Sequence, residues 1–123
     1  MQKSLRNLEE SFRKHAHELA KKARGARSQG NYVAAYCLDK EATGYLITAA
    51  QIDDVLAAKD KERKLRSLVQ WLRTLADDLE NRAKKEKGRG KYTFAYGLLS
   101  EAKTYRKAIA RLEKILKQSR TKK

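Results

Sequence analysis

The stretch that decides the fold is GNYVAAYCLDKEATGY at residues 30–45, because it returns as GKYTFAYGLLSEAKTY at residues 90–105. The two segments match at a fixed offset of 60 residues, and the same offset pairs all six tyrosines of the chain. These pairs are Tyr32/Tyr92, Tyr36/Tyr96 and Tyr45/Tyr105. The match extends outward without an insertion, for example to Leu5 and Leu65. The sequence therefore predicts one structural unit written twice.

The composition indicates one small helical domain. The chain has 123 residues and no proline, and alanine, leucine, lysine, arginine and glutamate dominate, which favours helix throughout. No run of apolar residues is long enough to span a membrane, and the first residues lack the apolar core of a signal peptide. The single cysteine, Cys37, cannot form an intramolecular disulfide and suits a reducing compartment. We expect a cytoplasmic protein.

Apolar residues recur at helical spacing in four stripes, two in each copy. The glycines at 30 and 90 lie in the polar turns that separate the two stripes of each copy. In copy one the stripes are Leu5, Leu8, Phe12, Ala16, Leu19 and Ala23, then Tyr32, Ala35, Leu38, Ala42, Tyr45, Leu46, Ala49, Ile52 and Leu56. In copy two they are Leu65, Leu68, Leu72, Leu75, Leu79 and Ala83, then Tyr92, Ala95, Leu98, Leu99, Ala102, Tyr105, Ile109, Leu112 and Leu116.

These stripes predict an all-α protein, a four-helix bundle made of two tandem duplicated helical hairpins in a single domain over residues 1–123. Hairpin one covers about residues 4–58, hairpin two about 61–119, and a short basic tail follows at 120–123. The join at 57–64 has neither glycine nor proline, so it is either a tight turn capped by Asp60 or a continuous helix of an extended dimer. We favour the turn, because a compact bundle buries all four stripes.

Small residues surround each predicted turn, with alanines at matching places and the motifs Gly30-Asn31-Tyr32 and Gly90-Lys91-Tyr92. This pattern resembles the tetratricopeptide repeat, and equally the helical modules of the microtubule-interacting and trafficking type. The resemblance covers about 30 residues of each copy and implies closely packed helical hairpins. The chain departs from the tetratricopeptide pattern in its period of 60 residues, in its lack of proline, and in the cations at Lys22 and Arg82. The peptide-binding groove of that family is therefore not expected here.

Residues that carry catalytic or metal chemistry do not cluster. His15 and His17 are two residues apart and point to different faces of a helix. No cysteine or carboxylate group has metal-ligand spacing, and Gly88-Arg89-Gly90 lacks the flanking residues of a phosphate-binding loop. Cys37 is interpreted as a packing residue. We expect no enzyme activity, no metal and no cofactor.

Charge is the second informative property. The formal net charge is +15, and it is divided unequally between the copies. Residues 1–60 hold 10 basic and 8 acidic side chains, whereas residues 61–123 hold 20 basic and 7 acidic, a net +2 against +13. Such a field attracts polyanions. A solubilising role for this charge is the simpler alternative.

Two basic surfaces are predicted. If the helices run up and down in turn, both glycine turns lie at one end, where cations and helix N-termini favour phosphate. The cations at this end are Lys21, Lys22, Arg24, Arg27, Arg82, Lys84, Lys85, Lys87, Arg89 and Lys91. The second surface follows one side of the last helix and comprises Lys103, Arg106, Lys107, Arg111, Lys114 and Lys117.

The aromatic residues have alternative interpretations. Tyr32, Tyr36, Tyr92 and Tyr96 either stack on nucleobases or wedge the helices of each hairpin together, and the wedge is favoured. Tyr45 and Tyr105 are expected in the core, with their hydroxyls at its rim. Trp71 has Ser11 as its counterpart, so it is either an exposed contact residue or part of a homodimer face.

The leading hypothesis is a small, basic, non-enzymatic protein that binds DNA or RNA through the phosphate backbone, alone or as a small subunit of a nucleoprotein complex. The alternative is an interaction module, an adaptor or inhibitor that docks its basic face on an acidic protein. Binding to a membrane surface is not expected, because the apolar side of the last helix is needed for the core.

Overall fold

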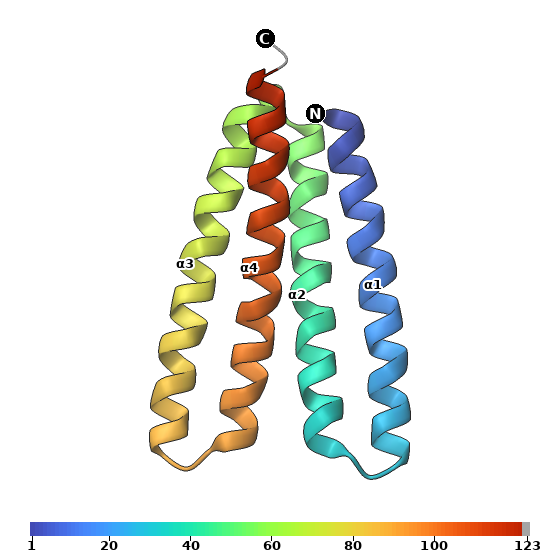
Figure 1. Ribbon diagram of the computed structural model, residues 1–123, viewed down its shortest axis with the longest axis vertical. Helices are drawn as coiled ribbons and strands as arrows, with labels where there is room; N and C mark the ends of the chain where they lie inside the picture. The colour runs from blue at the N-terminus through green and yellow to red at the C-terminus, as the bar shows by residue number, and fades with distance from the viewer. Residues whose placement is uncertain (122–123) are drawn as a thin grey trace.

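A computed structural model describes residues 1–121, which form four helices and no strand. They are α1 (Gln2–Ser28), α2 (Tyr32–Ala57), α3 (Lys61–Gly88) and α4 (Tyr92–Thr121). Figure 1 shows the helices side by side as two hairpins, which confirms the predicted all-α four-helix bundle. The predicted tail is in part helical, because α4 continues to Thr121. Lys122 and Lys123 lie outside the described residues.

The two hairpin turns are the same structure written twice. Gly30 and Gly90 have φ values of 81° and 79°, a left-handed conformation that glycine adopts without steric cost. The Gly30 N–H donates to the Arg27 carbonyl at 3.1 Å, and the next N–H, of Asn31, donates to the Ala26 carbonyl at 2.8 Å. This pair of bonds ends the helix as a Schellman motif. Copy two repeats both bonds, so the glycines explain why each hairpin closes in only three residues.

The join between the copies is a turn, as favoured from the sequence. α2 ends at Ala57 and α3 begins at Lys61, and the Asp60 carboxylate accepts a hydrogen bond from the Arg63 N–H at 3.1 Å. This contact caps α3, so the predicted capping role of Asp60 is confirmed. The chain therefore runs down, up, down and up, and both glycine turns lie at the lower end of Figure 1, called the turn end below.

The helices are not packed as a square. Figure 1 shows them in the order α3, α4, α2, α1, so that α2 and α4, which run parallel, form the centre. Each outer helix packs mainly on its own hairpin partner, and in the described chain α1 and α3 do not contact each other. The central helices are therefore covered on two sides and the outer helices on one.

The predicted stripe of α1 is buried in full, and most of the other three stripes are buried or half-buried. The prediction was wrong for Tyr32, Leu46, Tyr92 and Leu99, which lie on the solvent side of the central helices and are exposed. The reason is that α2 and α4 bury a second face against each other. That face includes small buried residues that carry no apolar signal: Gly44, Thr48, Gly97 and Thr104.

Equivalent positions meet at the centre of the bundle. A Cβ atom added at Gly44 would lie 2.8 Å from Cγ2 of Thr104, which is the residue 60 positions later. Nearer the turn end, a Cβ at Gly97 would overlap the ring of Tyr36. The central helices thus approach closely through glycine, and the meeting of residues 44 and 104 indicates a local twofold axis between the two hairpins.

Candidate nucleic-acid interface

The turn end gathers the first predicted basic surface. Within residues 20–40 and 80–100, 11 side chains are basic and three are acidic. Since both turns lie at the same end, the cations of the two copies lie at the same end of the bundle. Six of them are exposed and make no ion pair in the described part of the chain: Lys21, Lys22, Arg24, Lys84, Lys85 and Lys87.

The four other cations that were predicted at the turn end have partners. Arg27 donates to Asp39 at 2.5 Å across hairpin one. Arg89 lies 3.2 Å and Lys91 3.9 Å from the carboxylate of Glu86. The Arg82 guanidinium lies 5.9 Å from the ring centre of Phe94, a cation–π distance. These four side chains are therefore less free to meet an external anion.

The second predicted basic surface follows the outer face of α4. Lys103, Lys107, Arg111, Lys114 and Lys117 are all exposed and make no ion pair among the described residues. At the equivalent positions of α2 stand Thr43, Ile47, Gln51, Asp54 and Ala57, none of them basic. The outer faces of the two central helices have the same geometry and different charge.

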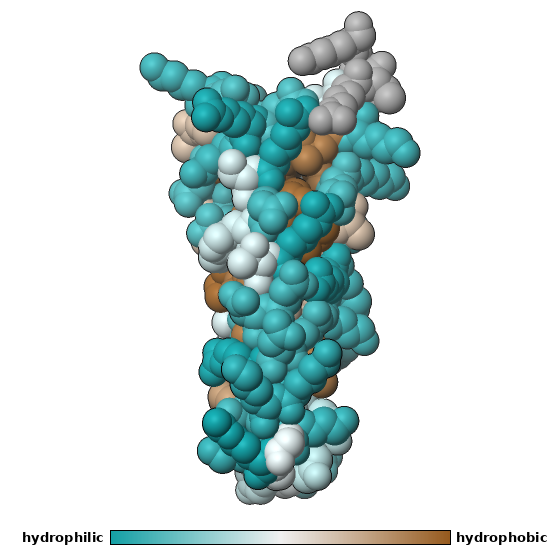
Figure 2. All heavy atoms as spheres, turned by 90° about the vertical axis from the view of Figure 1, so that its left-hand side faces the viewer, coloured by the Kyte–Doolittle hydropathy of each residue, from teal (hydrophilic) through white to brown (hydrophobic). Residues whose placement is uncertain are grey.

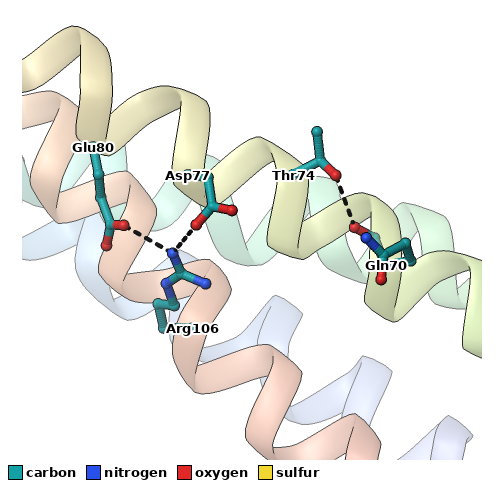
Figure 3. Close-up of polar contacts among 5 residues, drawn as sticks. All are labelled: Gln70, Thr74, Asp77, Glu80 and Arg106. Carbon is teal, nitrogen blue, oxygen red and sulfur yellow. Dashed lines mark hydrogen bonds and ion pairs between the residues drawn. The ribbon is translucent and has the colours of Figure 1, made fainter.

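Arg106 differs from the other predicted cations of α4. Figure 3 shows its guanidinium between two carboxylates of α3, with Nη2 2.5 Å from Asp77 and 2.8 Å from Glu80. Its bonds to Glu80 and Asp77 raise the pKa of the guanidinium above its ordinary value. Thr74, also drawn, only bonds the Gln70 carbonyl within α3. Arg106 thus bonds α4 to α3 and is less free than the other cations of α4 to meet an external anion.

Exposed tyrosines lie beside these cations. Tyr32 is 69% exposed, Tyr92 52% and Tyr96 45%, so the prediction that they wedge the helices of each hairpin is wrong. Tyr36 is half-buried, but it packs on Gly97 of the other hairpin, and Lys40 lies 5.5 Å from its ring centre. The rings at the turn end are therefore mostly available for stacking.

Tyr45 and Tyr105 are core residues, as predicted. The Tyr105 hydroxyl donates to the Glu101 carboxylate at 2.7 Å, and burial together with this bond raises its pKa well above the ordinary value. Burial also raises the pKa of Tyr45. His15 packs edge-on against the Tyr45 ring at 4.7 Å. No three metal-ligating side chains come together within the described residues.

A groove follows the seam between α3 and α4. Its cavity of about 620 Å³ is lined by apolar residues that include Val69 and Leu116, by the cations Arg66, Lys114 and Lys117, and by the ion pair of Arg73 with Glu113. Figure 2, seen from the α3 side, shows mainly hydrophilic side chains, with hydrophobic ones at the surface in the upper half. The predicted surface residue Trp71 is 45% exposed and lies on the other side of α3, facing α2.

Comparisons with protein-family models, curated proteins and solved structures found no match. The resemblance to tetratricopeptide hairpins therefore rests on the quoted turn residues alone. None of the helices in the described chain is both long and apolar enough to cross a membrane. The cytoplasmic location stays a prediction.

Two polar residues of α1 were not predicted from the sequence to lie at the basic surface. Ser4 and Asn7 lie beside Arg111 and Lys114 of α4, with more than 100 residues of chain between them. Neither residue belongs to a motif, and only the packing of α1 near the end of α4 brings them to the basic surface. The offset of 60 would have marked them as changed positions, since Lys64 and Ser67 are their counterparts.

Proposed function

We propose that this protein binds nucleic acid non-enzymatically, with the phosphate backbone held by the outer face of α4 and by the unpaired cations of the turn end. The observation that carries the proposal is the contrast between the central helices. Five exposed cations line α4 and make no ion pair with the residues that the structure describes, and none of the equivalent positions of α2 is basic. Because the two helices have the same structural role, the fold itself does not require these cations.

The exposed aromatic rings favour a single strand over a duplex. Tyr92 and Tyr96 lie on the same outer face of α4 as Lys103 and Lys107, nearer to the turn end. Proteins that bind single strands combine a basic track for the backbone with rings on which unpaired bases stack. α4 has 30 residues and is therefore about 45 Å long, which is enough for several nucleotides.

Titration of a labelled oligonucleotide at several salt concentrations tests this function. We expect the logarithm of affinity to fall linearly with the logarithm of salt concentration, by about 0.7 per phosphate contact on a single strand. Single-stranded DNA or RNA should bind more tightly than the duplex of equal length. Absence of binding to all of them at low salt would refute the proposal.

Replacement of Tyr92 and Tyr96 by leucine tests the stacking role. Both residues are exposed, so the fold should be retained. The preference for a single strand should fall, at about 1–3 kcal/mol for each base that loses its ring, while the salt slope stays the same. Trp71→Leu on α3 is the control, because its ring is also exposed but lies on the side of α3 that faces α2, away from the outer face of α4.

An acidic protein partner is the second candidate, and the groove between α3 and α4 favours it. The groove is apolar at Val69, whereas hairpin one has Glu9 at that position, bound to Arg13. An acidic peptide with apolar residues would complement both the apolar residues and the cations of the groove. If such a peptide binds tightly and no oligonucleotide binds at low salt, the acidic protein partner is favoured and the nucleic-acid proposal is refuted.

A further inference from the structure

Two small cavities lie toward the end of the bundle opposite the turns. The α1–α4 pocket has a volume of about 260 Å³, and the α2–α3 pocket about 320 Å³. The α1–α4 pocket is lined by Ser4, Asn7, Leu8, Arg111, Lys114 and Ile115. The α2–α3 pocket is lined by Gln51, Val55, Lys64, Ser67, Leu68 and Trp71.

The two pockets are copies of each other. An offset of 60 converts Ser4, Asn7 and Leu8 into Lys64, Ser67 and Leu68, and it converts Gln51 and Val55 into Arg111 and Ile115. The duplication has thus placed a cavity at each of two equivalent positions, with apolar residues in the lining of both. Where the lining residues of the two pockets differ in chemistry, the shared fold does not require the difference.

The α1–α4 pocket presents hydrogen-bond donors and positive charge. Arg111 and Lys114 come from α4, and the Ser4 hydroxyl and Asn7 amide face them from α1. No carboxylate is among the lining residues, and neither cation makes an ion pair in the described chain. A guanidinium beside an ammonium and two neutral donors suits the oxygens of a phosphate.

The α2–α3 pocket is less positive, because its lining has one cation, Lys64 at the position equivalent to Ser4, against two in the α1–α4 pocket. Gln51 replaces Arg111, and Asp54 stands at the position equivalent to Lys114. The N-terminal ends of α1 and α3 differ in charge in the same direction. The Asp60 carboxylate caps α3, whereas the residue before α1 makes no side-chain cap, so the positive end of that helix dipole is not offset.

We infer that the α1–α4 pocket is a phosphate-binding site, and that it holds one backbone phosphate of a strand lying along α4. The source of the phosphate rests on the proposed function, whereas the pocket itself does not. Lys114 borders both this pocket and the groove between α3 and α4, so a strand on the outer face of α4 reaches the pocket.

Titration with inorganic phosphate and pyrophosphate, followed by NMR of the ¹⁵N-labelled full chain, tests the pocket. Saturable shifts are expected at the Ser4 backbone amide and the Asn7 side-chain amide, and not at Ser67 in the second pocket. Arg111→Gln with Lys114→Asp gives these two positions the residues that α2 has at 51 and 54, and affinity should fall about tenfold or more. Shifts at Ser4 no larger than those at Ser67, or equal shifts with chloride, would overturn the inference.

A variant with the reciprocal substitutions in α2 controls for a loss of folding in the Arg111→Gln, Lys114→Asp variant. Gln51→Arg with Asp54→Lys should create phosphate binding in the α2–α3 pocket, with new shifts at Ser67 and a change in Trp71 fluorescence that the native chain does not show. No gain in this variant would contradict the assignment of binding to these two cations.

Oligonucleotide titrations of the native chain and of the Arg111→Gln, Lys114→Asp variant distinguish the pocket proposal from the proposed function. Phosphate binding at Ser4 and Asn7 without any oligonucleotide binding would support the pocket and overturn the proposed function. Oligonucleotide binding that is unchanged by Arg111→Gln with Lys114→Asp would support the function and overturn the pocket as a part of it.

Discussion

Hairpin one and hairpin two have the same framework. Each has a glycine turn with the same two terminal hydrogen bonds, and each has the same ion pair across its helices. Arg13 lies 2.7 Å from Asp53 in hairpin one, and Arg73 lies 2.7 Å from Glu113 in hairpin two, at positions exactly one offset apart. What the copies share therefore specifies the hairpin and its packing.

The hairpins differ most on their central helices. α2 carries one basic and four acidic residues, a net −3, whereas α4 carries seven basic and two acidic, a net +5. This difference does not serve the contact between them, because Asp39 and Asp53 of α2 pair with α1 and no ion pair joins α2 to α4 among the described residues. The comparison teaches that the added charge of α4 lies mainly on its exposed face, where the proposed partner would bind.

The largest expected effect comes from breaking the central contact. Gly44→Thr places a side chain against Thr104 and should lower the free energy of unfolding by about 1–3 kcal/mol. Thr104→Gly should cost about 2 kcal/mol, because it removes buried atoms and adds a glycine to a helix. The double variant exchanges equivalent residues, so chemical denaturation should show recovery of most of the loss.

Additive losses in the double variant would contradict the local twofold axis. Leu46→Ala is a control on the same helix, since its exposed side chain faces away from α4 and should change the stability little.

A smaller effect is expected at the paired core tyrosines. Tyr105→Phe removes the bond to Glu101 and should cost about 1 kcal/mol at neutral pH, whereas Tyr45→Phe should cost less, because its hydroxyl has no such bond. Burial raises the pKa of Tyr105 in the folded chain, so its stabilisation is full below the unfolded value of about 10. As the pH rises above that value, the unfolded chain ionises first and the stabilisation is lost.

Thermal unfolding of native chain and variant from pH 8 to 11 measures this effect. The advantage of the native chain over Tyr105→Phe should shrink above pH 10, by about 1.4 kcal/mol per pH unit. An advantage that is constant or grows with pH would show that the Tyr105 hydroxyl is not held neutral by the fold.

The smallest effect is expected at Arg106, which bonds Asp77 and Glu80 across hairpin two. Arg106→Leu introduces the residue that hairpin one has at Leu46, and it should cost about 0.5–1 kcal/mol because these ion pairs are exposed. The cost should decrease in 1 M salt, which screens exposed pairs. A loss of several kcal/mol, or no dependence on salt, would mean that Arg106 stabilises the bundle by packing and not by charge.

The sequence predicted much of the fold, for identifiable reasons. The stripe of α1 and the glycine turns were correct because an outer helix buries one face and an αL turn needs glycine. The second face of α2 and α4 was missed because Gly44 and Thr104 carry no apolar signal. For the candidate site, charge and offset located the cations, but only the structure could show that Arg106 is engaged by α3.

The contact of Ser4 and Asn7 with α4 could not be predicted for a related reason. It depends on how the two hairpins dock, and that docking is set by the small residues between α2 and α4. The exposure of Tyr92 and Tyr96 follows from the same docking, since it leaves the outer face of α4 open.

Oligonucleotide binding by two variants of equal net charge tests the central claim most directly. One replaces Lys103, Lys107, Lys114 and Lys117 of α4 by glutamine, and the other replaces the exposed cations Lys3, Lys14, Lys59 and Arg63. We predict that the α4 variant loses affinity and that its salt slope falls by about 0.7 for each lost phosphate contact, while the second variant retains both. Equal losses in the two variants would contradict the claim, because they would mean that net charge alone attracts the strand.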